Sequence, residues 1–212
     1  MKDSNNNRIS IPLPTIRRYP DYLRAIRAMI DRGEKRVSSV ILSEELGLDP
    51  VLTRKDLAMA GVAGRPRLGY PAVELAEAID RALGWDSMTD AVLIGAGSLG
   101  HALLGYKGFL GHGLRIVAAF DNSPNLIGTL VHGIEIQALD AIPEFVCKLN
   151  VKIGILTVPD TAAQSCADIL VSAGVKGIWN FATARLEVPK TVKVVNVDLA
   201  QSLAVLSHQI VR

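Results

Sequence analysis

The sequence predicts an α/β protein in which an N-terminal winged helix precedes a Rossmann-type parallel sheet domain with a C-terminal helix. Three observations predict this fold class. Short helical patterns punctuated by glycines run to residue 84, a strand–glycine–helix signature starts at residue 91, and the net charge changes sign along the chain. We therefore expect two domains, residues 1–84 and residues 85–212, with a linker near residues 85–89.

Length and composition exclude several classes of protein. The chain has 212 residues, 49% of them hydrophobic, which suits two modest packed domains. No apolar run approaches the roughly 18 residues of a membrane span, and residues 1–8 are polar and lack a signal-peptide core. We expect a cytoplasmic protein without membrane contact. Cys147 and Cys166 form no CxxC pair, so we expect two small buried thiols and no metal site.

The charge is distributed unevenly. Residues 1–70 carry 13 Lys and Arg against 8 Asp and Glu, whereas the remaining residues carry 10 against 13. A basic first third suggests that the N-terminal part binds a polyanion. An ordinary solvated surface would explain the charge equally well.

The first helix is expected to begin near residues 19–21, because the segment of residues 11–14 contains two prolines, and to end at Gly33. Ser38 or Ser39 can cap a second helix that Gly47 ends. Asp49, followed by proline, is expected to start a third helix that runs to Gly61. A fourth helix is expected from Pro71 to Gly84. Together, the second and third helices form a helix-turn-helix arrangement.

Two basic segments fit DNA recognition. Arg54 and Lys55 lie in the first half of the third helix, the part that enters the major groove in helix-turn-helix proteins. Arginine can bond guanine at two positions, and lysine suits phosphate or guanine. Arg65 and Arg67 lie in a glycine-bracketed ribbon, residues 64–69, which predicts a hairpin wing. The alternative is that residues 54–56 form a merely charged helix face.

The second domain begins with a dinucleotide-binding signature. Residues 91–94 form a buried-strand pattern, residues 95–100 read Gly-Ala-Gly-Ser-Leu-Gly, and a helical pattern follows. Gly95 permits the tight turn, Gly97 lets a pyrophosphate approach the backbone, and Gly100 lets helix and strand pack closely. The amides at the helix N-terminus favour phosphate groups.

Asp121 ends the next predicted strand, residues 116–120, 21 residues after Gly100. A carboxylate at this point can accept a hydrogen bond from a ribose 2′-hydroxyl and would repel a 2′-phosphate, so we expect NAD or NADH rather than the phosphorylated forms. The alternative is a Rossmann-like fold that binds no ligand.

The α/β pattern continues to the C-terminus. Helices are expected at residues 141–149 and 162–171, and strands at residues 152–158, 177–180 and 192–197. Asp198 is expected to cap a final helix with apolar residues on one side, which would pack on its own domain or on a partner subunit. No histidine lies in a catalytic context, and the chain outside the nucleotide fold is occupied by the winged helix. This favours a sensor without catalytic residues over an enzyme.

The sequence resembles the Rex family of redox-sensing transcriptional repressors over nearly its whole length. The residues that carry the resemblance are Ile11-Pro12 with Thr15, Arg54-Lys55-Asp56-Leu57, Gly69-Tyr70, the Gly95–Gly100 loop, Tyr106, Phe120-Asp121, Leu156-Thr157-Val158-Pro159, Gly174 with Lys176-Gly177-Ile178, Asn180-Phe181-Ala182 and Asn196-Val197-Asp198.

The resemblance implies a homodimer with a swapped C-terminal helix, in which NADH weakens binding to operator DNA and NAD⁺ competes with NADH. It places Tyr106 near the nicotinamide and implies a state-dependent contact between Arg24 and Asp198. The cofactor-binding residues that we expect are Gly95, Ala96, Gly97, Ser98, Leu99, Gly100, Tyr106, Asp121, Val158 and Asn180.

The sequence departs from the family pattern near the DNA-reading residues. Leu52-Thr53 stand where the family has a polar residue and then Val or Ile, Ala58 and Ala60 replace Ser and Phe, and the wing reads Arg65-Pro66-Arg67. Thr183 follows Ala182 where proline is usual. Two other functions stay open at this point, a small NAD-dependent dehydrogenase and a nucleotide-dependent adaptor that binds another protein.

Overall fold

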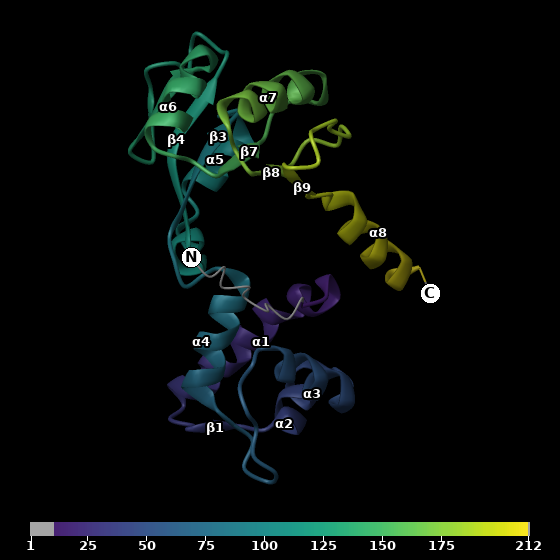
Figure 1. Ribbon diagram of the computed structural model, residues 1–212. Coiled ribbons are helices and arrows are strands. Elements are labelled where there is room, and N and C mark those ends of the chain that lie inside the picture. The colour runs from purple at the N-terminus through teal and green to yellow at the C-terminus, as the bar shows by residue number, and fades with distance from the viewer. Residues whose placement is uncertain (1–10, 212) are drawn as a thin grey trace. The chain divides into compact units, whose positions relative to one another are not determined.

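The computed structural model describes residues 11–211 and divides into two compact units, Met1–Ser87 and Met88–Arg212 (Figure 1). The division falls inside the segment 85–89 that the sequence suggests as a linker. The polar residues 1–8, which lack a signal-peptide core, lie outside the described residues. Within residues 11–211, no helix has both the length and the apolar character that crossing a membrane requires.

The first unit combines helices with a short antiparallel ribbon around its own core. Its elements are α1 (Leu13–Asp31), β1 (Arg36–Val37), α2 (Ser39–Leu46), α3 (Pro50–Met59), β2 (Tyr70–Pro71) and α4 (Ala72–Leu83). Strands β1 and β2 pair antiparallel, which closes the ribbon beside the helices. The core side chains include Tyr22, Ile26, Leu42, Leu57 and Ile79, so every helix of this unit contributes to one apolar centre.

Local capping sets both ends of α2, the start of α3 and the end of α4, as the sequence predicts. The Ser38 hydroxyl accepts a hydrogen bond from the Val40 amide, and the Asp49 carboxylate accepts one from the Leu52 amide at 2.8 Å. Gly47 and Gly84 end α2 and α4 in the left-handed conformation that glycine adopts without strain.

The predicted start of α1 near residues 19–21 is wrong, because the helix begins at Leu13. Pro14 lies in the first turn, where its missing N–H has no partner in the helix. Pro20 lies inside the helix and removes one backbone bond, but Thr15, Tyr19 and Tyr22 are buried around it. Tertiary packing therefore outweighs the local cost of this proline.

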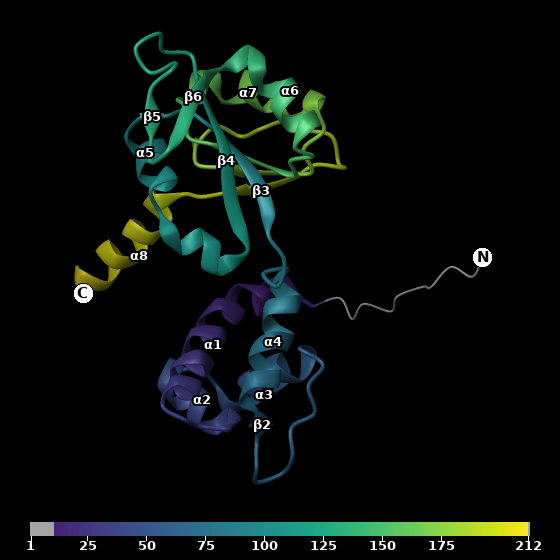
Figure 2. The same cartoon turned by 90° about the vertical axis from the view of Figure 1, so that its left-hand side faces the viewer.

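The second unit is built on a seven-stranded sheet in the order β5-β6-β4-β3-β7-β8-β9. The strands are β3 (Thr89–Ile94), β4 (Leu114–Asp121), β5 (Leu130–Val131), β6 (Ile134–Ala138), β7 (Ile153–Leu156), β8 (Gly177–Asn180) and β9 (Lys193–Asn196). All neighbouring pairs are parallel except β5 with β6, and Figure 2 shows β6, β4 and β3 side by side. The chain winds outward from β3 in both directions, so β3 and β7 meet at the switch point where such folds bind ligands.

Helices cover the two faces of this sheet unequally. The remaining elements are α5 (Ser98–Leu104), η1 (Lys107–His112), η2 (Leu139–Ala141), α6 (Ile142–Lys148), α7 (Asp160–Ala173) and α8 (Leu199–Ile210). Helices α6 and α7 pack on one face around Phe120 and Leu156. On the other face, Leu103 and Leu104 of α5 pack against the cluster that contains Leu93 and Ile155. The helix after the glycine loop is shorter than its pattern suggests, because it gives way to η1.

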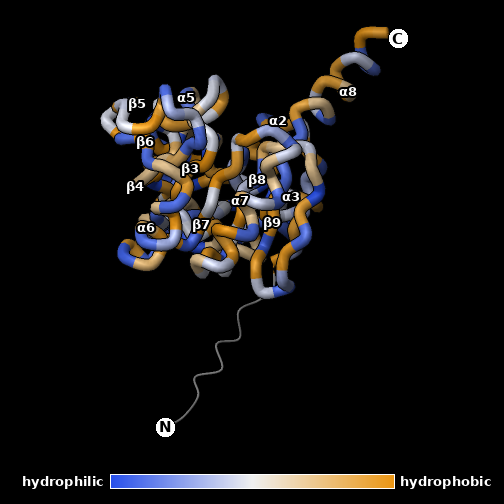
Figure 3. Tube along the Cα trace, turned by 90° about the horizontal axis from the view of Figure 1, so that it is seen from above, coloured by the Kyte–Doolittle hydropathy of each residue, from blue (hydrophilic) through white to orange (hydrophobic). Residues whose placement is uncertain are grey.

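Helix α8 has no buried residue, although it is amphipathic. Leu199, Leu203, Leu206 and Ile210, which recur at helical spacing, are 69%, 61%, 55% and 73% exposed. Figure 3 shows hydrophobic residues along much of this helix. The sequence left open whether the helix packs on its own domain, and within the second unit it does not.

Candidate functional site

Helix α3 turns its basic residues outward. Thr53, Asp56 and Leu57 are buried, whereas Arg54 and Lys55 are exposed. This alternation follows the helical repeat, so one face of α3 packs against the core of the first unit and the opposite face is exposed. The family departures at Ala58 and Leu52 fall on the exposed or half-exposed side. Thr53 fills the inward position, and its hydroxyl donates to the Asp49 carbonyl at 3.1 Å.

Residues 64–69 form the hairpin wing that the sequence predicts. The Arg65 and Gly69 amides each donate to the other residue's carbonyl, at 3.0 and 2.9 Å. Arg36 of β1 fixes the base of the wing, because its guanidinium donates to the Leu68 and Gly69 carbonyls, both at 2.7 Å. Gly69 is required at this base, since a Cβ there would lie 2.2 Å from the Val37 carbonyl oxygen.

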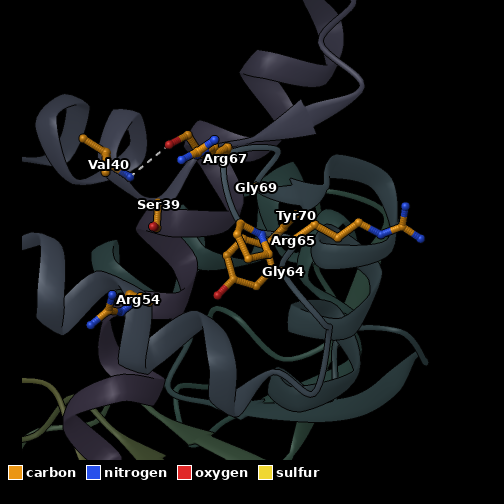
Figure 4. Close-up of a pocket in the computed structure, with 10 residues that line it drawn as sticks. Ser39, Val40, Arg54, Gly64, Arg65, Arg67, Gly69 and Tyr70 are labelled. Atoms are coloured by element: carbon orange, nitrogen blue, oxygen red, sulfur yellow. Dashed lines mark hydrogen bonds between the residues drawn. The ribbon is translucent and has the colours of Figure 1, made fainter.

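A concave basic pocket of about 430 Å³ lies between α3, the start of α2 and the wing (Figure 4). Arg54, Arg65 and Arg67 all line it, together with Ser38, Ser39 and Tyr70. Arg54 and Arg67 approach from opposite elements, and Arg65 extends away from Arg54 in the figure. The structure therefore brings three of the four predicted DNA-binding residues to one pocket, while Lys55 lies beside Arg54 on the exposed face of α3.

Asp56 is the residue of this motif that sequence reasoning did not assign. It is buried and hydrogen-bonded to α1. Burial raises the pKa of its carboxyl, but the hydrogen bonds from Arg18, Thr15 and Tyr22 outweigh burial and hold that pKa below its usual value. Burial, together with Asp56 and Tyr22, raises the pKa of Tyr19 to about 12. Asp56 is thus a buried residue that joins α3 to α1, but nothing in the sequence indicates which residues of α1 bond it.

The glycine-rich loop leaves space at the carboxyl end of β3. A Cβ on Gly95 would lie 2.8 Å from the Thr157 carbonyl oxygen, and one on Gly100 would lie 1.9 Å from the Gly95 carbonyl oxygen. These two glycines are therefore required by the packing of the loop itself. A Cβ on Gly97 would meet nothing within 4 Å. Glycine at this position leaves open space above the backbone, which fits the close approach of a pyrophosphate.

Asp121 closes the loop from the neighbouring strand. Its carboxylate accepts hydrogen bonds from the Ala96 amide at 2.7 Å and from the Ser123 amide at 2.8 Å. The hydroxyl of Thr157, at the end of β7, donates to the Gly95 carbonyl at 2.6 Å. Asp121 and Thr157 thus hold the loop from both sides of β3. Thr157 lies in the run Leu156-Thr157-Val158-Pro159, and nothing in that run predicts that its hydroxyl holds the glycine loop.

A cavity of about 170 Å³ lies against this loop. Gly95, Gly97, Asp121 and Val158 line it, so it collects four of the expected cofactor-binding residues. Cys166 also lines it, and burial raises the pKa of its thiol. The expectation of two buried thiols is wrong for Cys147, which is exposed.

Tyr106 and Asn180 lie in different environments. Tyr106 follows α5, is 54% exposed and stacks edge-to-face on Phe109. Asn180 is fully buried. Its side-chain nitrogen donates to the Ala184 carbonyl and to Oδ1 of Asn196, and its side-chain oxygen accepts a hydrogen bond from the Ala182 amide. These contacts are structural, so a direct role of Asn180 in cofactor binding stays a prediction.

The departure at Thr183 is compensated within the structure. The Asp160 carboxylate accepts hydrogen bonds from the Thr183 hydroxyl, the Thr183 amide and the Ala184 amide. The hydrogen bond from the Thr183 hydroxyl is the main reason why the pKa of Asp160 lies below its usual value. This threonine therefore orders the loop after β8 through a side chain that proline lacks.

The two residues expected to couple the domains have local partners. Arg24 pairs with Asp21 at 2.6 Å along the exposed side of α1. Asp198 caps α8, accepting a hydrogen bond from the Ala200 amide at 2.9 Å. A contact between Arg24 and Asp198 stays a prediction. Among residues 11–211, no group of three or more His, Cys, Asp or Glu side chains is arranged to hold a metal ion.

Comparisons with known proteins match both parts of the chain. A family model described as a putative DNA-binding protein N-terminus matches residues 10–58, and one described as a CoA binding domain matches residues 86–184. A redox-sensing transcriptional repressor Rex from Treponema denticola is 42% identical, covering 91% of this chain and 92% of that protein. A protein of the same name from Clostridium botulinum is 39% identical, with 98% of each chain covered.

Solved structures resemble the chain over nearly its full length. RSP in complex with β-NAD⁺ and operator DNA has a TM-score of 0.89 at 36% identity, covering 94% of this chain and 92% of RSP. RSP in complex with β-NADH has a TM-score of 0.86 at 35% identity, covering 95% and 94%. Similarity at this level extends through both units of the chain.

Proposed function

The chain belongs to the Rex family of redox-sensing transcriptional repressors, and we propose that it represses transcription by binding operator DNA as a homodimer that NADH releases. The observation that carries this proposal is that one chain contains both a basic pocket suited to DNA and a cavity beside a glycine-rich loop suited to a dinucleotide. Arg54 and Arg67 line the first, and Gly97 and Asp121 line the second. Its relatives are named as repressors, which favours a sensor over a dehydrogenase.

The DNA-binding step follows from the chemistry of the basic pocket. Arg54 reads a guanine edge in the major groove, because its guanidinium donates two parallel hydrogen bonds. Lys55, on the same exposed face, contacts phosphate. Arg65 and Arg67 of the wing contact the backbone or the minor groove, where a basic side chain meets a negative potential. RSP was solved with operator DNA, and this chain shares its fold at 36% identity.

The sensing step depends on the loop between β3 and α5. The amides at the start of α5 and the open space above Gly97 hold the pyrophosphate, and Asp121 accepts a hydrogen bond from the adenosine ribose. Once bound, the dinucleotide presents a nicotinamide ring that is cationic in NAD⁺ and neutral in NADH. Tyr106, exposed beyond α5, is the residue that we place near this ring.

The homodimer is supported by the unpartnered face of α8. Its leucines would cost free energy in water, at about 25 cal/mol per Å² of apolar surface. Val195, on the edge strand β9, lies beside Trp179 of β8 and is 61% exposed, so apolar surface at this edge of the sheet is also open to a partner. We propose that α8 of one protomer packs on its partner, and that the repressor acts in the cytoplasm.

Selection of duplexes from a random DNA library, with and without NADH, tests this function. We expect a pseudo-palindromic sequence to be enriched by the protein alone or with NAD⁺, and the enrichment to fall when NADH is added. Arg54→Ala is the matched variant, with an expected loss of about 1–3 kcal/mol in binding the selected sequence. Lys55→Ala should instead weaken all duplexes alike and reduce the salt dependence. Enrichment of no sequence at low salt would contradict the proposal.

A further inference from the structure

Asp56 is a charged residue at the centre of the contact between α3 and α1. It is 1% exposed, although it directly follows the exposed pair Arg54 and Lys55 in the chain. An ionised carboxylate is buried at a high cost unless hydrogen bonds and a partner charge surround it. The environment of Asp56 supplies both.

Five hydrogen bonds from α1 converge on this residue. Thr15 and Arg18 donate to Oδ1, both at 2.9 Å, and Arg18 and Tyr22 donate to Oδ2 at 2.6 and 2.9 Å. The Tyr19 hydroxyl donates to the Asp56 carbonyl at 3.0 Å. The four donor residues are spaced three or four positions apart, so they lie on one face of α1 and all bond the same residue of α3.

These bonds matter for orientation because α3 buries few large side chains. Its fully buried residues are Thr53, Asp56 and Leu57, of which Leu57 alone is a large apolar side chain. Apolar packing is non-directional, whereas a two-pronged arginine–carboxylate pair fixes geometry. Successive residues of an α-helix are about 100° apart, so a turn of α3 by one position would carry either Arg54 or Lys55, depending on its direction, off the exposed face.

We propose that Asp56 is a positioning residue for DNA recognition, which fixes the rotation of α3 through Arg18, Thr15 and Tyr22 so that Arg54 and Lys55 face the groove together. This inference rests on the proposed function. It also makes α1 and α3 one rigid body, so any displacement of α1 is passed to the reading helix. Asp56 itself touches no base or phosphate.

The test requires a variant that removes the directional bonds without leaving a buried charge. Removing one partner alone leaves the other charge buried, and the loss of DNA binding would then have two explanations. The double variant Arg18→Met/Asp56→Leu replaces the pair by apolar side chains of similar size. The matched control is Arg27→Met/Asp80→Leu, which removes a second ion pair of α1, at 2.7 Å, that joins α4 instead.

The full-length parent and both double variants are compared by thermal unfolding, NADH titration and binding to the selected duplex and a scrambled duplex. We expect all three proteins to fold and to bind NADH alike. For Arg18→Met/Asp56→Leu, the ratio of selected to scrambled affinity should fall at least tenfold, while scrambled affinity stays within twofold. Tyr22→Phe, which removes one bond and keeps the ring, should lower the ratio less. The control should keep the parent's ratio.

Amide hydrogen exchange in residues 50–59 provides a readout that does not depend on DNA. Exchange there should accelerate in Arg18→Met/Asp56→Leu and not in the control. A folded double variant with the parent's specificity would overturn the inference, and so would unchanged exchange in α3. A parent protein that prefers no duplex would contradict the proposed function instead, and the exchange measurement would then decide the role of Asp56.

Discussion

The choice of dinucleotide rests on the carboxylate of Asp121. It already accepts hydrogen bonds from the Ala96 and Ser123 amides, so it is held at the edge of the cavity beside the glycine loop. A 2′-phosphate at this position would meet a fixed negative charge. NADH should therefore bind at least about tenfold more tightly than NADPH, the ratio that a difference of about 1.4 kcal/mol produces.

Calorimetric titration of both dinucleotides checks this prediction. Asp121→Ala should reduce the ratio of NADH affinity to NADPH affinity. Asp121→Asn, which keeps an acceptor and loses the charge, should reduce this ratio with less loss of NADH affinity. Equal affinity of the parent protein for NADH and NADPH would refute the assignment of Asp121 to the ribose.

Arg67 occupies a strained position at the tip of the wing. Its φ of 63° is in the left-handed region, which costs a non-glycine residue about 1–2 kcal/mol. Strain of this kind persists where surrounding structure or function requires the side chain. Arg67→Gly should therefore raise the unfolding temperature, because glycine adopts this conformation freely, and should weaken duplex binding.

The variant Arg67→Gly can also show whether Arg67 contacts the minor or the major groove of DNA. Inosine–cytosine pairs present the minor groove of an A·T pair, because the guanine amino group is absent, and the major groove of a G·C pair. If Arg67 enters a narrow minor groove, the parent should bind a duplex with inosine–cytosine pairs beneath the wing more tightly than one with G·C pairs there. Arg67→Gly should bind the two duplexes alike. Unchanged affinity of the glycine variant for every duplex would remove Arg67 from the binding surface.

At the level of elements, the α1–α3 contact makes the first unit sensitive to acid. The pKa of Asp56 is held below its usual value, because the hydrogen bonds from α1 outweigh burial. A carboxyl with a lowered pKa in the folded state contributes stability above its usual pKa and loses it as the pH falls through the lowered value. The stability of the first unit should therefore decline below about pH 4.

Chemical denaturation at a series of pH values measures this decline, with hydrogen exchange in α1 and α3 as the signal that reports unfolding of the first unit. In Arg18→Met/Asp56→Leu the decline should be shallower than in Arg27→Met/Asp80→Leu. Identical pH profiles of the two double variants would show that Asp56 does not carry the effect.

Helix α8 should hold the dimer together. An isolated helix of 12 residues is marginal in water, and all four leucine and isoleucine side chains of its apolar face are exposed. Leu203→Asp/Leu206→Asp should shift the protein toward monomer in sedimentation experiments, since two carboxylates would be buried at the interface. Gln201→Asp/His208→Asp, on the opposite face of the same helix, should leave the association state unchanged. A monomeric parent, or a dimeric leucine variant, would contradict this role.

How much of the structure could be predicted varied with the range of the interactions involved. Both ends of α2 and the start of α3 were predicted because Ser38, Gly47 and Asp49 act within a few residues. The β5–β6 hairpin was missed, because its turn places His132 rather than Asn or Asp before Gly133, with a φ of 50°.

The glycine loop and Asp121 were predicted because a known strand–turn–helix unit places them together. The partners of Asp56 were not, since the donors lie 34–41 residues earlier in the chain and their spacing in α1 fits an ordinary core face. Similarly, nothing local indicates that Thr183 bonds Asp160, because the two residues meet only when α7 and the loop after β8 pack.

At the level of the whole molecule, sensing requires that NADH and DNA favour different conformational states. A ligand shifts an equilibrium only by its differential affinity for two states. Asp198 begins α8, and Arg24 lies on α1, which Asp56 joins to the reading helix. We predict that Asp198→Ala leaves NADH binding measurable and reduces the factor by which NADH weakens DNA binding. A large factor that the variant leaves unchanged would retain the sensor and exclude this contact.

Whether this protein senses NADH is decided by titrating the full-length parent with the selected duplex at one salt concentration, with and without saturating NADH. NADH should weaken duplex binding at least about tenfold, a coupling of about 1.4 kcal/mol, and the duplex should weaken NADH binding by the same factor. NAD⁺ at saturation should leave duplex binding nearly unchanged. A ratio near one between the affinities with and without NADH would contradict the claim that this chain senses NADH.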